Sequence, residues 1–521
     1  MVYKLLSFQF FTAFLIFAQS SVSAGPGDWP SYDGSLTGNR HSELAQITKT
    51  NIGGLKLSWS LPISNPGDLE VTPVVIGGVM YATGVNQVLA LNAANGKQLW
   101  HYSRPQSTGL IDDAASGINR GVAVSDQYVI FATDNAHLVA LNKQTGKIAW
   151  ETVMADSTQN YGATGAPLVV GNVVIMGHSG GDDGVRGFLA GYDIQTGKRK
   201  WTFWTVPEPS EPAAATWKSD TDLPHGGGAT WMTGTYDSAN DILYWTTGNP
   251  GPDYDGDKRL GSNLYTDSVL ALRPETGQLL WYYQFTPHDL FDFDAQQTPM
   301  LVDAEFNGKQ RSLLLQSSRN GFFYVLDRLT GEFLRATPFV TNLTWATSTS
   351  GSPPVPVPAE TPSVAGTTVC PSTGGGTTWM SNAFDTSSKF FFLMSNESCA
   401  AYFKSPTVFI PGQGDYGGTS VTAFFEKHVR AIDLKTGKIA WDKSLVGPGQ
   451  TNSGVLSTAG GLVFFGDDNG NFTAVDSATG NQAWTYVTTQ AWHASPMTYA
   501  VNNKQYVAIA APTQLMVFAL D

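Results

Sequence analysis

Hydrophobic and polar positions alternate along this chain in short segments that are separated by turns. One phrase recurs: an apolar segment ends in Asp, Asn or Arg, a turn with Gly follows, and an apolar pair and usually Trp come next. It reads ALNAANGKQLW at Ala90 to Trp100 and ALNKQTGKIAW at Ala140 to Trp150. Such alternation is typical of half-buried β-strands, and the glycine supplies the positive φ of a tight hairpin. Each copy is therefore predicted to be a β-hairpin.

The phrase occurs in regular series from one end of the chain to the other. Its turn glycines are Gly96, Gly146, Gly197, Gly277, Gly331, Gly437 and Gly480. Most spacings are roughly 50 residues, the length of a four-stranded propeller blade. The copy at Val325 to Leu334 has lost its Trp, and the double-length gap from Gly331 to Gly437 predicts one hidden copy. The sequence thus predicts a single all-β domain, an eight-bladed β-propeller in which each Trp pins one blade to the next around a central ligand-binding funnel.

The first residues have the pattern of a secretory signal. Lys4 precedes an apolar run from Leu5 to Phe17, and the small residues Val22, Ser23 and Ala24 form a cleavage site. The run is short for a membrane span, although a retained anchor is the alternative. We expect residues 1–24 to be removed and residues 25–521 to form the exported domain, periplasmic or secreted, with no membrane span after removal.

Composition narrows the class of protein further. A formal net charge of −13 argues against a nucleic-acid partner, because phosphate binding requires a basic surface. An acidic surface suits solubility or a basic partner. The two cysteines, Cys370 and Cys399, are expected to form a disulfide in an oxidising compartment, with two buried thiols as the alternative. No Cys-x-x-Cys-His motif for covalent haem attachment is present in the sequence.

The stretch TPHDLFDFD, Thr286 to Asp294, concentrates chemistry in a chain with 14% charged residues. If the segment is a strand, Asp292 and Asp294 point to the same side, since side chains alternate. Two neighbouring carboxylates repel each other unless a cation or a proton lies between them. The stretch therefore predicts either a metal site beside a base or a solvated acidic turn.

Six segments are similar to the pyrroloquinoline-quinone (PQQ) dependent alcohol dehydrogenases, the methanol dehydrogenase type included. The segments are Gly27–Trp59, Thr164–Asp193, Gly226–Asp237 (GGGATWMTGTYD), Thr246–Pro250 (TTGNP), Thr286–Asp294 and Arg319–Gly331 (RNGFFYVLDRLTG). The resemblance covers nearly the whole chain after residue 24, and the motifs keep the family's order. It implies an eight-bladed propeller and an exported enzyme that oxidises an alcohol to the aldehyde by hydride transfer to PQQ.

The resemblance also implies a metal site. Asp292 corresponds to the catalytic base, and the metal ligands correspond to Asp182, Asn249, Asp292 and Asp294. Family members that use calcium carry a small residue at the place of Asp294, whereas those that use a lanthanide carry Asp. A trivalent hard ion favours the additional anionic oxygen, so a lanthanide-type site is expected, with calcium left open. Asp182 stands where the family has Glu, and Asp183 is an alternative ligand.

For the cofactor, Trp231 matches the family's stacking floor, and Arg120 and Arg319 match contacts to the quinone and its carboxylates. Further matches are Glu70, Thr164, Ser179, Gly180, Gly181, Thr378, Trp379 and Trp492. Ala114 and Ala115 stand where many members have two adjacent cysteines that cap the cofactor.

The resemblance implies that electrons leave to a separate acceptor, a soluble cytochrome c. The alternative is a non-catalytic propeller, either a PQQ-binding sensor or an outer-membrane assembly scaffold. A scaffold has no reason to keep Asp182, Asn249, Asp292, Arg319 and Trp231 together. The sequence leaves open which alcohol is oxidised and the oligomeric state, a homodimer included.

Overall fold

The structure is a computed structural model that describes residues 24–111, 115, 117–218, 223–348, 352–447 and 449–521. The expected signal segment, apart from Ala24, lies outside the described residues, and so does Ala114.

Regular structure in the described part of the chain is mainly β. The strands form eight sheets of four or five strands and one two-stranded hairpin. Four sheets from the first half of the chain have their strands in these orders: β3(Val74–Ile76)-β4(Val79–Gly84)-β5(Gln87–Asn92)-β6(Gln98–Ser103), β7(Ala123–Val124)-β8(Tyr128–Ala132)-β9(His137–Asn142)-β10(Ile148–Val153), β11(Leu168–Val170)-β12(Val173–Met176)-β13(Phe188–Asp193)-β14(Arg199–Trp204) and β15(Thr235–Asp237)-β16(Ile242–Thr246)-β17(Ser268–Leu272)-β18(Leu279–Gln284).

The other four sheets include strands from both ends of the chain. They are β19(Met300–Phe306)-β20(Lys309–Ser317)-β21(Phe322–Asp327)-β22(Phe333–Pro338), β25(Thr367–Val369)-β27(Phe390–Lys404)-β28(Gly418–Asp433)-β29(Ile439–Leu445) with β26(Ala383–Asp385) beside β27, β1(His41–Ser42)-β30(Val455–Thr458)-β31(Leu462–Gly466)-β32(Asn471–Asp476)-β33(Gln482–Val487) and β2(Lys56–Pro62)-β36(Gln514–Ala519)-β35(Lys504–Ala511)-β34(Met497–Val501). The separate hairpin is β23(Ala346–Thr347)-β24(Val355–Pro356).

Short 3-10 helices lie in the connections: η1(Ile52–Gly54), η2(Ser157–Gln159), η3(Gly181–Asp183), η4(Pro212–Thr216), η5(Leu223–His225) and η6(Pro358–Glu360). The described residues contain no helix that is long and apolar enough to cross a membrane. The predicted all-β class is confirmed, and the sheets are consistent with a β-propeller.

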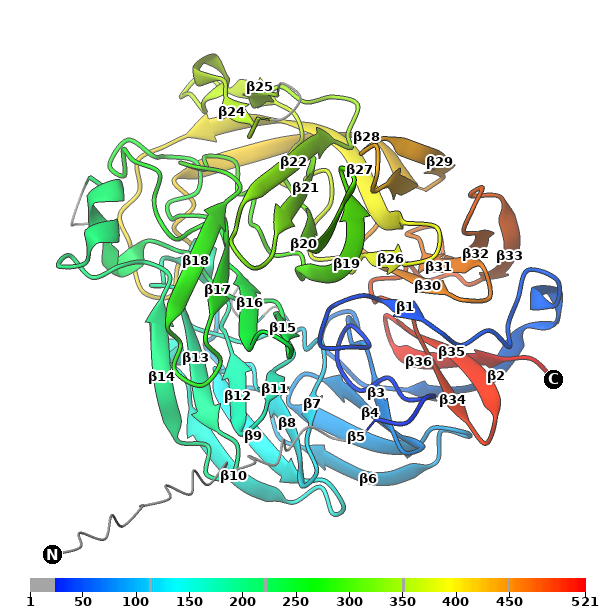
Figure 1. The fold of residues 1–521 in the computed structure, drawn as a ribbon. Helices are drawn as coiled ribbons and strands as arrows, with labels where there is room; N and C mark the ends of the chain where they lie inside the picture. The colour runs from blue at the N-terminus through cyan, green and yellow to red at the C-terminus, as the bar shows by residue number, and fades with distance from the viewer. Residues whose placement is uncertain (1–23, 112–114, 116, 219–222, 349–351, 448) are drawn as a thin grey trace, which may run out of the picture.

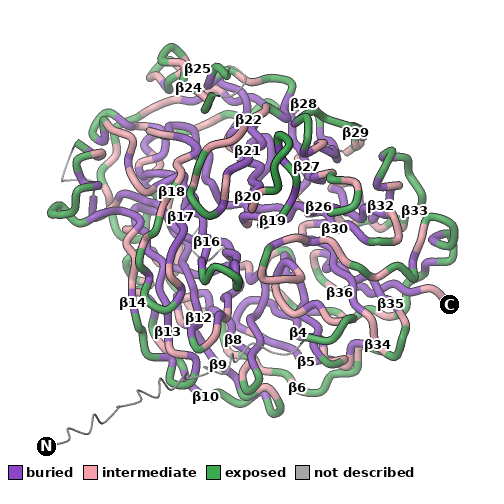
Figure 2. The backbone as a smooth tube through the Cα atoms, viewed as in Figure 1, coloured by how far each residue is buried: buried purple, intermediate pink, exposed green. Residues whose placement is uncertain are grey.

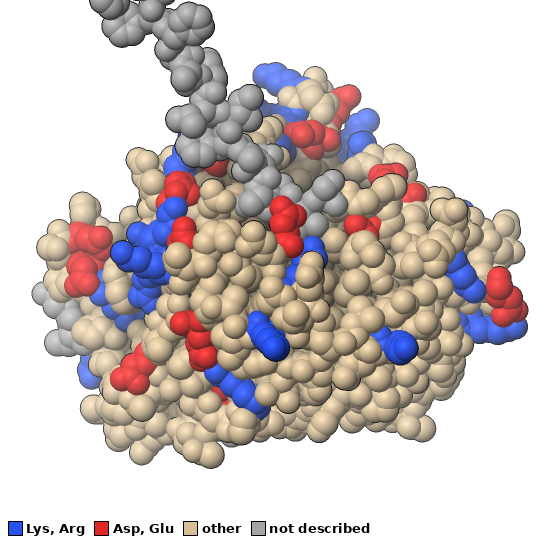
Figure 3. Space-filling view, turned by 90° about the horizontal axis from the view of Figure 1, so that it is seen from below, with Lys and Arg blue, Asp and Glu red and all other residues tan. Residues whose placement is uncertain are grey.

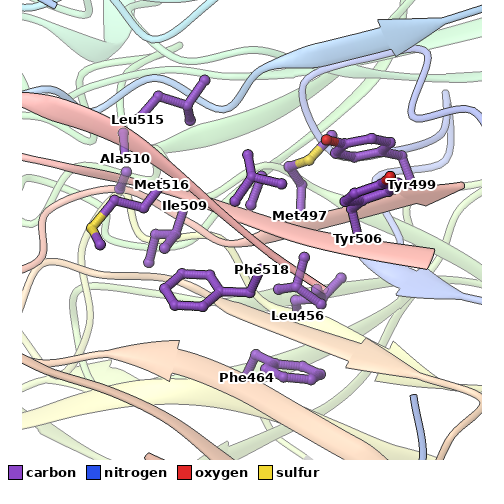
Figure 4. Packing of buried hydrophobic residues seen from close by; sticks show 14 of the residues in the cluster. Leu456, Phe464, Met497, Tyr499, Tyr506, Ile509, Ala510, Leu515, Met516 and Phe518 are labelled. Carbon is purple, nitrogen blue, oxygen red and sulfur yellow. The ribbon is translucent and has the colours of Figure 1, made fainter. Parts of the chain in front are cut away.

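The sheets follow one another around a common centre, as Figure 1 shows. Buried side chains of each sheet pack on those of the next; Val88 of β5 and Phe131 of β8, for example, belong to one cluster. The cluster in Figure 4 joins Phe464 of β31 to Phe518 of β36 and also includes Met80 of β4. Hydrophobic burial between neighbouring sheets therefore holds the molecule together.

Strands from the two ends of the chain close the arrangement. β2 pairs antiparallel with β36, and β1 pairs parallel with β30. Figure 2 shows the buried backbone concentrated on the inner strands and the exposed backbone on the outer hairpins. On the face in Figure 3, acidic and basic side chains are scattered between uncharged residues, so neither sign forms a continuous patch there.

Tryptophan rings lie against turn glycines of the following sheet. A Cβ on Gly277, for example, would lie 2.5 Å from the ring of Trp201, whose indole N–H donates to the Pro274 carbonyl at 2.9 Å. The same contact joins Trp59 to Gly96, Trp100 to Gly146, Trp150 to Gly197, Trp281 to Gly331 and Trp441 to Gly480. In the copy that lacks Trp, Arg335 lies against Gly437 and donates to the carbonyls of Leu434 and Lys435 instead.

The prediction of a hidden copy between Gly331 and Gly437 is wrong. Strands β25 to β29 form a single sheet, and the long strands β27 and β28 together with the β23–β24 hairpin account for the extra length. The sheet without the phrase is the one that joins β2 to β34, β35 and β36. The spacing of repeats along the sequence could not show that strands from both ends of the chain form one sheet.

The predicted disulfide between Cys370 and Cys399 is confirmed. It joins the residue that follows β25 to the middle of β27. The bond thereby ties the chain just after β25 to β27, its neighbour in the same sheet.

Candidate active site

Connections from four successive sheets meet around one cavity of about 160 Å³. They enter the first strand or leave the second strand of these sheets, so the same end of each sheet faces the cavity. The lining residues are Arg120, Thr164, Ser179, Gly180, Gly181, Asp182, Ala229, Trp231, Asn249, Asp294 and Arg319. Apart from Ala229, each of them belongs to the predicted site, which the fold has assembled from distant parts of the sequence.

The HSGGDD motif forms a tight loop on one wall of this cavity. Gly180 has φ +98°, a left-handed conformation that glycine adopts without strain, and η3 follows directly. His178 fixes the start of the loop: its Nδ1 is 3.0 Å from the Ser179 carbonyl, and its Nε2 accepts the Phe188 N–H at 3.0 Å. Burial lowers the pKa of His178 to about 4, so the ring is neutral.

Arg120 lies between the two predicted tryptophans. Its guanidinium carbon is 4.9 Å from the ring centre of Trp231 and 4.7 Å from that of Trp379. Arg120 also pairs with Glu70 at 2.7 Å and donates to the Thr164 hydroxyl at 2.8 Å. Burial raises the pKa of Glu70 to about 7, against the opposing effect of Arg120. These contacts form a rigid, cationic wall that is suited to a flat anionic ligand.

Arg319 connects the two acids of the Asp-x-Asp motif. It is 2.7 Å from Asp292 Oδ1 and 3.1 Å from Asp294 Oδ2, and it donates to the Thr378 hydroxyl at 3.2 Å. Asp294 also accepts the Asn249 backbone N–H at 3.1 Å and is hydrogen-bonded to the Trp231 side chain. Arg319 therefore links the cavity to the predicted base.

Asp292 and Asp294 do not lie on a strand, so the alternation of strand side chains does not place their carboxylates. No strand covers residues 286–299, and Asp292 has φ +59°. The Asp289 carboxylate accepts the N–H groups of Phe291 and Phe293 at 2.9 and 2.6 Å, which turns the chain. As a result, Asp294 lines the 160 Å³ cavity, Asp292 lines a second cavity, and Arg319 lines both.

Acidic groups outnumber cations in this region. Burial raises the pKa of Asp292 well above its usual range; Arg319 opposes the shift, and Asp182, Asp294 and Asp289 add to it. Burial and neighbouring acids also raise the pKa values of Asp253, Asp267 and Asp289. The basic partners of these acids are Arg259 and Arg319. Such an excess of buried negative charge fits a site for a polyvalent hard cation.

Three of the four predicted metal ligands, Asp182, Asn249 and Asp294, line the same cavity. The fourth, Asp292, is paired with Arg319, and the described residues contain no ready group of three His, Cys, Asp or Glu side chains placed to hold a metal ion. Asn249 is oriented by Asp253, whose Oδ1 accepts its side-chain N–H at 2.8 Å. The donor chemistry fits a hard cation, and the ligand set stays a prediction.

Two orphaned nitrogen atoms support the fit to an anionic cofactor. Nε of Arg120 and Nε of Arg319 are buried and have no hydrogen-bond partner within the described part of the chain. Both side chains line the 160 Å³ cavity beside Trp231. A planar ligand with several carboxylates supplies acceptors for such groups.

Of the other predicted residues, two lie beside the site and one lies away from both cavities. Thr378 lines the second cavity, and Trp379 lies on Arg120. Trp492 is fully buried in the hydrophobic cluster against Phe472, with ring centres 5.6 Å apart, and it lines neither of these two cavities. Asp253, Asp267 and Arg259 were not predicted to belong to the site. The acid-rich stretch after Asn249 could have indicated Asp253.

A family model described as the "Glucose/ethanol/alcohol dehydrogenase, beta-propeller domain" of the PQQ type matches residues 29–338 and 427–507. The chain belongs to the PQQ-dependent alcohol dehydrogenase family. This quinoprotein is therefore an alcohol-oxidising oxidoreductase, and the expected family resemblance is confirmed.

The quinoprotein is similar to two known enzymes over 93% of its own length. It is 36% identical to the quinohemoprotein alcohol dehydrogenase ADH IIB of Pseudomonas putida, over 93% of this chain and 73% of the relative. It is 32% identical to the lanthanide-dependent methanol dehydrogenase of Methylacidiphilum fumariolicum (strain SolV), over 93% and 84% of the respective chains.

Among solved structures, the quinoprotein is similar to a europium-containing methanol dehydrogenase. The TM-score is 0.88 at 29% identity, and the match covers 95% of this chain and 98% of the other.

Proposed function

We propose that the protein oxidises a primary alcohol to the aldehyde, with PQQ bound in the 160 Å³ cavity on Trp231. The observation that supports this most is that ten residues expected from sequence motifs line that single cavity. Arg120 and Arg319 hold the carboxylates of the cofactor, and Glu70, Thr378 and Trp379 complete the proposed contacts, whereas the buried Trp492 is left out of this set. A hard cation, lanthanide or calcium, is held by Asp182, Asn249, Asp292 and Asp294.

When bound, PQQ supplies a two-electron acceptor for the hydride that leaves the carbinol carbon, and the cation supplies Lewis acidity. The alcohol enters the second cavity, which Asp292 lines. Asp292 accepts the hydroxyl proton, and Arg319 keeps its carboxylate oriented through the 2.7 Å ion pair. The alcohol thus loses one hydride and one proton.

We also propose the setting of this reaction. The eight sheets act as eight blades that are docked by the tryptophan contacts, and residues 25–521 form this domain after removal of residues 1–24. The enzyme is exported to the periplasm or secreted, and it passes electrons to a soluble cytochrome c, as the family resemblance implies. A homodimer is one oligomeric state to be tested.

Reconstitution of the purified protein tests the proposal. PQQ is added with lanthanum or with calcium, and dye reduction is followed over a panel of alcohols. We expect alcohol-dependent reduction with lanthanum, and Asp294→Ala is expected to lose more activity with lanthanum than with calcium. Absence of reduction with either metal contradicts the proposed reaction and favours a protein that binds the quinone without oxidation. Activity with calcium alone contradicts the role of Asp294.

A further inference from the structure

The second cavity differs from the first in size and in chemistry. Its volume is about 490 Å³, which lies in the range of sites for small organic ligands. Seven of the nine residues that line it have a hydroxyl, amide or charged side chain; the lining consists of Asp292, Arg319, Thr373, Gly374, Thr378, Ser420, Thr422, Phe424 and Gln450. Phe424 is the one large apolar side chain among these lining residues.

The hydroxyls of Thr373 and Ser420 form a hydroxyl wall of this cavity, and the buried hydroxyls of Tyr254 and Tyr402 lie close to them. The Tyr254 hydroxyl is 3.4 Å from the hydroxyls of Thr373 and Ser420, and the Thr373 hydroxyl is 3.4 Å from those of Ser420 and Tyr402. Hydrogen bonds between hydroxyls are normally 2.7–2.8 Å long, so these contacts are weak. Each hydroxyl has one donor and two acceptor positions, which leaves capacity for a ligand hydroxyl.

The hydroxyl wall belongs to the same space as the proposed base. Thr373, Ser420 and Asp292 line one cavity, and the Tyr402 hydroxyl is 3.5 Å from the carbonyl of Phe291, the residue before Asp292. Ser420 and Thr422 are two apart on β28 and both line the cavity, as strand alternation requires. A molecule whose reacting hydroxyl meets Asp292 therefore extends along these polar groups.

We propose that the preferred substrate carries at least one hydroxyl beyond the one that is oxidised, and thus is a diol or a polyol. This inference rests on the proposed function. An unsubstituted alkyl chain would cover the half-buried hydroxyls of Thr373 and Ser420 without pairing them, and these groups would lose hydrogen bonds to water. A second hydroxyl on the substrate replaces the weak 3.4 Å contacts by pairs of normal length.

A four-carbon series tests the substrate class at constant chain length: butan-1-ol, butane-1,4-diol and butane-1,2,4-triol. We expect kcat/KM of the reconstituted enzyme for the diol or the triol to exceed that for butan-1-ol at least tenfold. Ser420→Ala and Thr373→Val should each reduce this ratio about fivefold, as expected for loss of one hydrogen bond of about 1 kcal/mol. A ratio near one, or a preference for butan-1-ol, overturns the proposal.

Thr419→Ala is the matched control. Thr419 precedes Ser420 on β28, is exposed and does not line the cavity, so the ratio should stay as in the wild type. An equal loss of the ratio in Thr419→Ala and Ser420→Ala overturns the assignment of the hydroxyl wall.

Binding to the cofactor-free protein gives a readout that is independent of catalysis. Saturation-transfer NMR should show stronger transfer to the triol than to butan-1-ol, and Ser420→Ala should remove that difference. If no alcohol is oxidised but the triol binds preferentially, the proposed reaction fails and the substrate class holds. If butan-1-ol is oxidised and the triol shows no preference in either experiment, the substrate class fails and the reaction holds.

Discussion

The folded protein shifts the pKa of an aspartate in an outer hairpin and the pKa of an aspartate beside the cavity in opposite directions. In the hairpin after β13, Asp193 Oδ1 accepts the N–H groups of Gln195 and Thr196 at 3.1 and 2.9 Å and the Thr196 hydroxyl at 2.7 Å. Burial raises the pKa of Asp193, but these hydrogen bonds outweigh it and lower the pKa below its usual value. At Asp292, burial raises the pKa strongly and nearby acids add to the shift, although Arg319 opposes it.

The difference shows which carboxylates find their hydrogen-bond donors within their own turn. A hairpin aspartate finds its donors within three residues, so the turn is complete in itself and can be repeated along the chain. The cavity acids come from separate sheets and repel one another, and two arginines balance only part of their charge. The hairpins thus stabilise the fold, whereas the cavity is arranged for a bound partner.

The largest expected effect is on catalysis. Asp292→Asn should lower kcat about 10²–10⁴-fold, because a general base contributes on that order. Dye-linked steady-state kinetics of the reconstituted enzyme measure this effect. Asp126→Asn removes a carboxylate from an exposed turn and should leave kcat unchanged. Wild-type kcat in Asp292→Asn would assign the base to another group.

The next effect concerns a hairpin. Gly277→Ala and Gly308→Ala both place Ala at a positive φ, +71° and +75°, but only Gly277 lies against a tryptophan ring, that of Trp201. Gly277→Ala should therefore destabilise the protein by about 1–3 kcal/mol more than Gly308→Ala, because of overpacking. Denaturant unfolding compares the two variants. Equal losses would show that the ring contact adds nothing to the backbone strain.

The next effect depends on pH. The pKa of His178 is lowered from 6.5 to about 4 in the folded state, so the unfolded chain binds more protons between these values. Stability should consequently fall as the pH drops from 6.5 to 4, by up to about 1.4 kcal/mol per pH unit from this residue. Unfolding of His178→Gln should show a flatter dependence, and the exposed His101→Gln should match the wild type. Identical slopes for all three proteins would contradict a role of His178.

The smallest effect is expected at the hairpin aspartate. Asp193→Asn keeps an acceptor oxygen for the turn and removes a charge that solvent screens, so it should cost less than about 1 kcal/mol. Because the folded pKa is lowered, the stabilisation is present at neutral pH and is lost as the pH falls below the usual range of Asp. Thermal unfolding at pH 7 and pH 3 measures both changes. A loss above 2 kcal/mol at pH 7 would remove the contrast with the cavity.

Most residues of the site could be predicted from the sequence, whereas the backbone conformation around Asp292 could not. The resemblance of the motifs to the PQQ-dependent alcohol dehydrogenases identified ten of the eleven residues that line the 160 Å³ cavity. No strand forms at Asp292, since the Asp289 side chain turns the backbone there. No local pattern gave Asp253 a role, because its contact with Asn249 depends on a loop conformation.

The sequence by itself determined the repeated hairpins, because the alternating strands, the turn acceptor and the turn glycine interact within about ten residues of one another. Only the tertiary structure decided that β2 joins β36 in the eighth sheet, and that Arg319 lines both the Asp292 cavity and the Asp294 cavity. These features arise from contacts between residues far apart in the chain, where burial and charge balance depend on packing that no local pattern contains.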